Sequence, residues 1–168
     1  HALTRAAPAA AGLGGGHCLL GRLGDGSERV AIAGLGRIQA TVKQAAEALV
    51  AEDAIYISLN FDNPELAQIE PWTGRRQGRQ IYIDTFSNVG TYWEVNDFQI
   101  TDMISEGEMV AAFGQFTYTS VEVGHRFTSP LAIKATVKNG LITFFQFMED
   151  TYASARSFRK SGSWEIQN

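Results

Sequence analysis

The residues whose types and spacing could perform acid/base chemistry gather around one apolar stretch, residues 139–150 (NGLITFFQFMED). The Asn-Gly pair at its start favours a type I′ turn, because both residues tolerate a positive φ. The stretch therefore predicts a hairpin in which residues 132–137 pair antiparallel with residues 142–149. Asp150 follows the apolar strand directly. A carboxylate beside apolar side chains is a candidate general base, because desolvation raises its pKa toward neutrality.

Side chains alternate between the two faces of a strand. One face of this strand carries Ile142, Phe144, Gln146, Met148 and Asp150, and the other carries Thr143, Phe145, Phe147 and Glu149. Both sets are largely apolar, so both faces need cover. We expect the first set to line an internal pocket with Asp150 at its rim or floor. The face that carries Phe145 and Phe147 would then lie against a helix or a second subunit, and we predict a homodimer because this face needs cover.

A base that removes a proton next to a carbonyl group needs a hydrogen-bond donor near the carbonyl oxygen. With Asp150 as the base, Tyr56 and Gln115 are the predicted catalytic partners, and Tyr118 is a further candidate donor. The predicted substrate-binding residues are Trp72, Phe113, Thr117, Phe144, Gln146, Met148 and His125. Two alternatives stay open: His125 follows Gly124 in a predicted turn and can be an exposed turn residue, and Asp150 can instead cap a terminal helix.

The composition limits the classes of function. A chain of 168 residues with a net charge of -4 predicts one domain and disfavours nucleic acid as a partner, since phosphate contacts need clustered Lys and Arg. The single Cys18 excludes an internal disulfide, so we expect a cytoplasmic protein. No run of apolar residues is long enough to span a membrane. The scattered His and Cys residues lack metal-ligand spacing, and we expect neither a metal nor a cofactor.

The rest of the chain supplies the elements that position these residues. Residues 1–27 are rich in Ala and Gly and predict an N-terminal extension, and residues 28–168 predict a single domain. We expect helices over 28–50, with a break near Gly36, and over 78–88, before Gly90. Strands are expected over 54–60, 92–104 with a bulge near 96–97, 109–121 and 126–137. Residues 61–74 predict a loop, and 151–159 a short helix or coil. This order predicts an α+β fold, in which a curved antiparallel sheet wraps around helices.

Several motifs occur in a characteristic order: AEDAIY at 51–56, TGRRQGR at 73–79 followed by Phe86, SEGEMV at 105–110, GHRF at 124–127, NGLI at 139–142 and FQFMEDT at 145–151. Over residues 28–159 the chain resembles the SnoaL-like polyketide cyclases. These belong to the superfamily of nuclear transport factor 2, ketosteroid isomerase, scytalone dehydratase and limonene epoxide hydrolase. The resemblance implies a conical α+β barrel with a deep, mainly apolar pocket, commonly in a homodimer packed through the outer face of the sheet.

The resemblance also bears on the site. Cyclases of this type use a pocket aspartate with a histidine as helper, and Asp150 matches the position of the pocket aspartate in limonene epoxide hydrolase. That enzyme places an Arg and an Asp on the preceding long strand, where this chain has Gln115 and Thr117. Neither residue is charged, so the hydrolase's relay of three charged residues is absent.

Two classes of function follow. The first is a cofactor-free enzyme that acts on a small apolar or polycyclic molecule by acid/base chemistry, as an isomerase, cyclase or epoxide hydrolase does. The second is a non-catalytic protein that binds or transports a small hydrophobic ligand. Polar groups that converge near the base would favour the enzyme, whereas bare Phe and Met walls would favour the binding protein.

Overall fold

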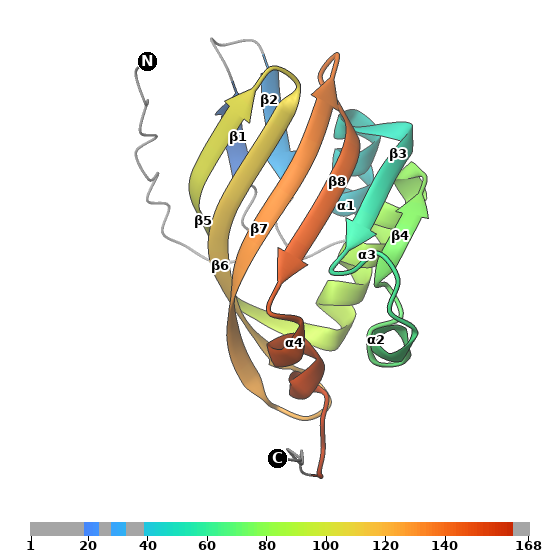
Figure 1. Cartoon of the computed structure of the whole chain (residues 1–168), viewed down its shortest axis with the longest axis vertical. Helices are drawn as coiled ribbons and strands as arrows, with labels where there is room; N and C mark the ends of the chain where they lie inside the picture. The colour runs from blue at the N-terminus through green and yellow to red at the C-terminus, as the bar shows by residue number, and fades with distance from the viewer. Residues whose placement is uncertain (1–18, 24–27, 33–38, 163–168) are drawn as a thin grey trace, which may run out of the picture.

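A curved six-stranded sheet with helices on its concave side forms the body of the molecule (Figure 1). The structure is a computed structural model that describes residues 19–23, 28–32 and 39–162. The strands of this sheet are β3 (Val50–Ser58), β4 (Gly74–Gln77), β5 (Trp93–Glu106), β6 (Met109–Ser120), β7 (Arg126–Lys138) and β8 (Leu141–Glu149). Their spatial order is β4-β3-β8-β7-β6-β5, and only β3 and β8 pair in parallel. Among the described strands, β4 and β5 are the edges, so the sheet is not closed.

Four helices complete the described structure: α1 (Gln39–Leu49), α2 (Pro64–Ile69), α3 (Arg79–Tyr92) and α4 (Thr151–Ser157). Helices α1 and α3 contact each other and β3, behind the sheet in Figure 1. Helix α4 follows β8 and contacts β7. A separate hairpin of β1 (Leu19–Leu23) and β2 (Glu28–Ile32) contacts β5 and α1. No helix in the described ranges is long and apolar enough to cross a membrane.

The predicted α+β architecture is confirmed, and so are the hairpin that joins β7 to β8 and the bulge in β5. Asn139 and Gly140 have φ values of 50° and 79°, as a type I′ turn requires. The register of β5 shifts between Val95 and Asp97. The two-residue turn forces β7 and β8 to pair along nearly their whole length, and this pairing fixes which side chains share a face.

Three predicted elements differ from the structure. Residues 28–32 form strand β2 rather than the start of a helix, and residues 33–38, where the helix break was expected, lie outside the described residues. The expected loop over 61–74 contains α2, which begins where the Asn63 side chain accepts a hydrogen bond from Leu66 N (2.9 Å). Helix α3 continues through Gly90 to Tyr92, since Gly90 does not adopt the positive φ that would end the helix there. Most of residues 1–27 lies outside the described residues.

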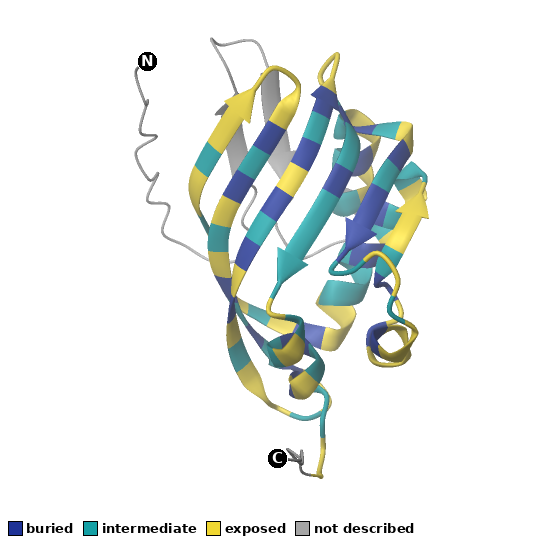
Figure 2. Ribbon diagram, in the orientation of Figure 1, coloured by how far each residue is buried: buried dark blue, intermediate teal, exposed yellow. Residues whose placement is uncertain are grey.

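The core lies between the concave face of the sheet and the helices, and buried side chains recur at alternate positions along β6 and β7 (Figure 2). The strand register aligns these positions into rows that cross the sheet. One row runs from Tyr56 through Phe145 and Ala135 to Val110, and each of its members is at most 5% exposed. Because burial of one large apolar side chain stabilises a fold by about 1.5–3 kcal/mol, such rows hold the curved sheet on its helices.

Strands β5 and β6 approach each other unusually closely at Gly114. A Cβ atom at this position would lie 1.9 Å from the carbonyl oxygen of Gln99, which is a backbone atom and cannot rotate away. Only glycine fits this crossing without a shift of β5. Gly114 pairs with Leu131, which in turn pairs with Glu149. The close approach lies next to the register shift in β5 between Ile100 and Asp102.

Candidate active site

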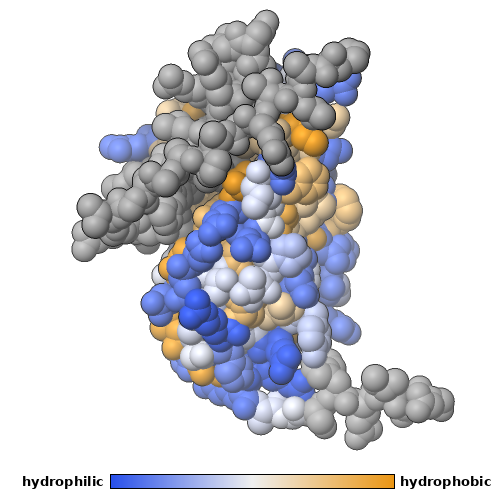
Figure 3. Space-filling view, turned by 90° about the vertical axis from the view of Figure 1, so that its left-hand side faces the viewer, coloured by the Kyte–Doolittle hydropathy of each residue, from blue (hydrophilic) through white to orange (hydrophobic). Residues whose placement is uncertain are grey.

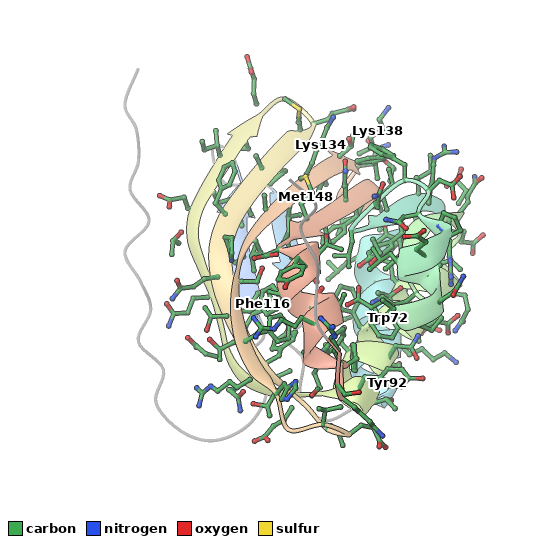
Figure 4. All side chains as sticks on the ribbon, turned by 60° about the horizontal axis from the view of Figure 1, so that its bottom comes forward. Trp72, Tyr92, Phe116, Lys134, Lys138 and Met148 are labelled. Atoms are coloured by element: carbon green, nitrogen blue, oxygen red, sulfur yellow. The ribbon has the colours of Figure 1, made fainter. Side chains whose placement is uncertain are left out.

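The interior face of β8 carries Phe145, Phe147 and Glu149. The Phe145 ring stacks on Tyr56 with centroids 5.6 Å apart and planes 8° apart, and the Phe147 ring lies 6.1 Å from Phe116. Phe116 lies on the side of the sheet that faces α4 (Figure 4). Glu149 pairs with Leu131, which is 3% exposed. The last side chain of this apolar face is therefore a carboxyl group.

The predicted orientation of β8 is wrong, because Phe144, Gln146 and Met148 lie on the outer face. Phe144 carries the Lys134 ammonium 5.8 Å above its ring centre, and Lys134 reaches the outline of the molecule in Figure 4. Both faces of β8 are apolar, so alternation alone could not identify the interior one. The strand register also places three further predicted pocket residues on this outer face: Phe113, Gln115 and Thr117. These side chains do not point into the interior.

Glu149 is partly buried at the end of the interior face. Burial is the largest cause of a rise in its pKa from 4.5 to about 8, and the nearby Glu70 carboxyl is the next largest. The charge of Asp150 adds a smaller increase. A carboxyl group with such a pKa keeps its proton at neutral pH and can exchange it with a substrate.

Glu70 brings a second carboxyl group to the same place. It is fully buried, and neither of its side-chain oxygens has a hydrogen-bond partner. Burial is the largest cause of a rise in its pKa from 4.5 to about 7. Ser154 Oγ donates its one proton to the Thr151 carbonyl oxygen (3.1 Å), so that proton does not also satisfy Glu70. An unpaired charge would be costly here, which favours the protonated form of Glu70.

Glu70 stands on the connection between β3 and β4, residues 59–73, rather than on the sheet. Strand β3 ends at Ser58, and the next residue, Leu59, has a φ of 60°, which is rare for a non-glycine residue. Asn60 N donates to Ser58 O (2.7 Å) across it. This tight turn sends the chain away from the sheet. Helix α2 then returns it, and Glu70 N donates to Leu66 O (2.7 Å) at the end of that helix.

Two tyrosines adjoin the carboxyl groups. Burial raises the pKa of Tyr56 well above its usual value, and the charge of Glu149 adds to the increase. Burial likewise raises the pKa of Tyr118, as do the charges of Glu149 and Tyr56. Both phenols therefore stay protonated at neutral pH, and each can donate a hydrogen bond to an oxygen atom of a ligand.

Most of the elements that carry this cluster of Glu70, Glu149, Tyr56 and Tyr118 contain no basic residue. Strands β3, β6 and β8 and helix α2 have no Lys, Arg or His in their sequences, and the one basic residue of α4, Arg156, is exposed. Accordingly, no cation contributes to the pKa shifts of Glu70, Glu149, Tyr56 or Tyr118. The cluster is built to keep carboxyl groups protonated rather than to pair them with cations.

Asp150 is not the buried base that the sequence suggested. Its side chain is exposed and accepts a hydrogen bond from Ala153 N (3.1 Å), so it caps α4, as the alternative reading proposed. The strand ends at Glu149, and the backbone of Asp150 turns into the helix with φ -72° and ψ 88°. The alternation of a strand therefore no longer applies to Asp150, and the preceding residue is the buried acid.

The other predicted site residues are dispersed. Tyr56 is in the cluster, but Gln115 is exposed on the outer face of β6. His125 is exposed in the turn between β6 and β7, where its backbone N–H donates to Ser120 Oγ (3.2 Å). Trp72 is buried two residues after Glu70 and stacks on Tyr92 with centroids 5.2 Å apart (Figure 4). It anchors the connection that carries Glu70.

The sequence reasoning missed both carboxyl groups. Glu149 shares its parity with Phe145 and Phe147, so the correct orientation of β8 would have pointed to it. Glu70 gave no such signal, since it lies in a segment with two prolines between an exposed Ile69 and Pro71. Its burial depends on the path of the connection, which no local pattern encodes.

Comparison with known proteins gives consistent results. A family model described as a SnoaL-like domain matches residues 37–145. Patulin synthesis protein F of Aspergillus clavatus is 43% identical over 118 residues, which are 68% of this chain and 60% of that protein. Patulin biosynthesis cluster protein F of Penicillium expansum is 42% identical over 121 residues, 70% of this chain and 61% of that protein. The chain thus spans about three fifths of the length of these relatives.

Solved structures share the fold at low sequence identity. An NTF2-like protein from Burkholderia xenovorans has a TM-score of 0.59 and 20% identity, with 70% of this chain and 83% of that chain covered. A second NTF2-like protein, from Burkholderia thailandensis, has a TM-score of 0.59 and 19% identity over 71% and 90% of the two chains. TerC, co-crystallised with polyporic acid, has a TM-score of 0.53 and 19% identity over 67% and 82%.

Proposed function

Because this chain belongs to the SnoaL-like domain family, which its family model shows, we propose that it is a cofactor-free enzyme of the isomerase or cyclase type. The reaction we propose moves protons within a small oxygenated molecule. The observation that carries the proposal is the pair of carboxyl groups, the fully buried Glu70 and the partly buried Glu149, beside two protonated tyrosines. A fold of this kind does not by itself indicate catalysis, so the proposal depends on the site.

The pair supplies both an acid and a base at neutral pH. With pKa values of about 7 and about 8, Glu70 and Glu149 together hold one proton over much of the range between these values, and the two values belong to the pair. The ionised carboxyl removes a proton from a carbon atom next to a carbonyl group. Tyr56, Tyr118 or the protonated carboxyl donates a hydrogen bond to the carbonyl oxygen, where negative charge develops.

The charge of the site favours an uncharged substrate. A ligand with a carboxylate or phosphate would meet acids only, without a cation to pair with. A neutral ring compound with carbonyl oxygens would instead accept hydrogen bonds from the phenols and lie against Phe145 and Phe147. The relatives named for patulin synthesis support a role in making a small oxygenated metabolite. That role is a proposal, because the match covers only part of their length.

Hydrogen–deuterium exchange tests the chemistry without knowledge of the natural product. We expect the purified chain to accelerate the exchange of α-protons in uncharged cyclic enones dissolved in heavy water, measured by proton NMR. Glu149→Gln and Glu70→Gln should slow this exchange by at least about 100-fold, the usual contribution of a general base. Exchange no faster than in buffer across a panel of such enones would contradict the proposal.

The second candidate is a non-catalytic protein that binds a small hydrophobic ligand, and the aromatic interior favours it. Binding of the enones without any exchange of their protons would support this alternative.

We further propose a homodimer packed through the outer face of the sheet. Ile104, Met109 and Phe113 on β5 and β6 are 59%, 49% and 44% exposed. Figure 3 shows apolar side chains gathered at the upper right of the view. Phe144 and Met148 continue this face toward β8. The sequence reasoning expected a dimer over Phe145 and Phe147, but these residues face the interior. An apolar outer face of this kind is a suitable surface for a second copy.

A further inference from the structure

Helix α3 carries two buried residues, Tyr82 and Thr85, on one line of its surface. Residues three apart in a helix are neighbours, with Cβ atoms about 5–6 Å apart. The centre of the Tyr82 ring lies 4.9 Å from that of Tyr56 and 5.9 Å from that of Phe145. Thr85 therefore lies about one turn further along the line of α3 that faces the candidate site.

The other end of α3 contacts the connection between β3 and β4. Tyr92 follows Thr85 by about two turns, which places both residues on the same side of the helix. Tyr92 stacks on Trp72 with centroids 5.2 Å apart (Figure 4), and Trp72 is two residues after Glu70. Along α3, Thr85 thus lies between the contact with Tyr56 and the contact with Trp72.

The Thr85 hydroxyl is buried without a hydrogen-bond partner among the described residues. The residue is 3% exposed, and no atom within hydrogen-bonding distance satisfies Oγ1. A threonine in a helix can donate to a carbonyl oxygen of the preceding turn, as Thr91 Oγ1 does to Ser87 O (3.0 Å) in the same helix. In the described part of the chain, the only other buried side chain with unpartnered oxygens is Glu70.

We propose that Thr85 is a substrate-binding residue, whose hydroxyl forms a hydrogen bond with a second oxygen function of the ligand. A buried hydroxyl without a partner destabilises the free protein, and an oxygen atom of a bound ligand would satisfy it. The carboxyl pair and the phenols would meanwhile hold the reacting carbonyl group. The substrate class narrows from any uncharged enone to a ring with at least two oxygen functions. The identity of the reacting group rests on the proposed function, but binding by Thr85 does not require catalysis.

The melting temperature tests whether the hydroxyl lacks a partner in the free chain. Thr85→Val keeps the branched shape and replaces the hydroxyl by a methyl group. We expect its melting temperature to rise by about 2–4 °C, because an unpaired buried hydroxyl is removed. Thr91→Val is the matched control on the same helix: it removes an exposed hydroxyl that is bonded to Ser87 O, and its melting temperature should not rise. A lower melting temperature in Thr85→Val would overturn the proposal, because the hydroxyl would then have a partner within the chain.

Ligand preference tests the binding role. We would titrate 2-cyclohexenone and its 4-hydroxy and 5-hydroxy derivatives into the chain and measure each Kd from amide NMR shifts. We expect the wild type to bind at least one hydroxylated enone about 10-fold more tightly than 2-cyclohexenone, as one added hydrogen bond to a buried group allows. Thr85→Val should lose this preference, and Thr85→Ser, which keeps the hydroxyl, should retain it. Thr91→Val should bind all three compounds as the wild type does.

The outcomes separate this proposal from the proposed function. A preference that persists in Thr85→Val, or a wild type that binds all three compounds equally or not at all, would overturn the role of Thr85 even in a chain that exchanges enone protons. A preference lost in Thr85→Val and kept in Thr85→Ser would support the role even if the wild type exchanged no protons and the proposed function failed. In an active chain, Thr85→Val should raise KM for the hydroxylated enone and leave KM for 2-cyclohexenone unchanged, whereas a merely structural role would change both alike.

Discussion

Glu149 and Asp150 are joined by one peptide bond and lie in opposite environments. The Glu149 carboxyl adjoins Glu70 inside the molecule, whereas the Asp150 carboxyl is exposed and accepts a hydrogen bond from Ala153 N. The end of β8 and the start of α4 meet between them. One acid is thereby available for chemistry, and its neighbour stabilises the helix that supports it.

The carboxyl pair should make stability fall as pH rises. In the unfolded chain both acids ionise near 4.5, but in the folded chain they do so near 7 and 8. Between about pH 4.5 and pH 8 the folded state therefore binds more protons than the unfolded state. Each carboxyl lowers the free energy of unfolding by about 1.4 kcal/mol per pH unit from about pH 4.5 up to its folded pKa. We expect urea midpoints to decrease from pH 5 to pH 8.5.

Glu149→Gln and Glu70→Gln should each flatten this pH dependence and make the chain more stable than the wild type at pH 8.5. An exposed acid of β3 provides the control, since Glu52→Gln should leave the slope unchanged. A wild-type stability that rose from pH 5 to pH 8.5 would show that the pair is not buried in the folded chain.

The stability that Asp150 gives to α4 should depend on its hydrogen-bond acceptor more than on its charge. Asp150→Ala removes the acceptor for Ala153 N, and we expect a loss of about 1 kcal/mol in the free energy of unfolding. Asp150→Asn keeps an acceptor of similar size and should cost only a few tenths of a kcal/mol. Chemical denaturation of both variants measures the difference. Equal losses in the two variants would mean that the charge, not the cap, matters.

The phenols should affect catalysis more than folding. Tyr56→Phe and Tyr118→Phe keep the rings that pack against Phe145 and Phe116, centroids 5.6 Å and 4.4 Å away. Each removes one donor to the developing oxyanion, so we expect the more important of the two to lower the exchange rate about 100-fold with little change in melting temperature. Tyr82→Phe is a control from α3, because its hydroxyl donates to Ile55 O (3.0 Å) instead. Unchanged exchange rates in both Tyr56→Phe and Tyr118→Phe would exclude the two phenols as donors.

The close approach of β5 and β6 predicts the effect of a single methyl group. Gly114→Ala should lower the free energy of unfolding by about 1–3 kcal/mol or more, because its Cβ would meet the Gln99 carbonyl oxygen. Gly90→Ala, in α3 with open space around it, should instead be stabilising by about 0.5–1 kcal/mol. Thermal melts of the two variants should move in opposite directions.

The proposed dimer predicts a change of mass without a change of fold. We expect the wild-type chain to sediment as a dimer at micromolar concentration and Phe113→Glu to sediment as a monomer with the same circular dichroism spectrum. The side chain is 44% exposed in the single chain, so its replacement removes little from the core. Thr101 is an exposed residue of β5, and Thr101→Glu tests whether a charge added elsewhere on the sheet also dissociates the dimer. A monomeric wild type would contradict the dimer.

The fold could be predicted from the sequence because its signals are local. The Asn139-Gly140 turn, the alternation along β6 and β7 and the order of motifs each act within a few residues, and the structure contains the hairpin and the sheet that they indicate. The face of β8 could not be predicted in this way. Phenylalanine occupies both faces, and the decision depends on what covers each one.

The candidate site was harder still to predict, since its two acids come from distant parts of the chain. Glu149 was within one residue of the predicted base, but the change from strand to helix reversed the expected environments of Glu149 and Asp150. The burial of Glu70 follows from the turn at Leu59 and the anchoring of Trp72. These are tertiary features without a periodic pattern.

The division of the carboxyl pair between β8 and the β3–β4 connection has an evolutionary consequence. Glu149 belongs to the scaffold, and its replacement changes a strand in the middle of the sheet. Glu70 belongs to a connection next to the edge strand β4, where insertions and exchanges disturb few pairings. Replacement of this one peripheral segment can therefore change or remove the second acid without a change in the order of the strands. A chain in which residues 59–73 are replaced should lose Glu70 and keep the order of the sheet.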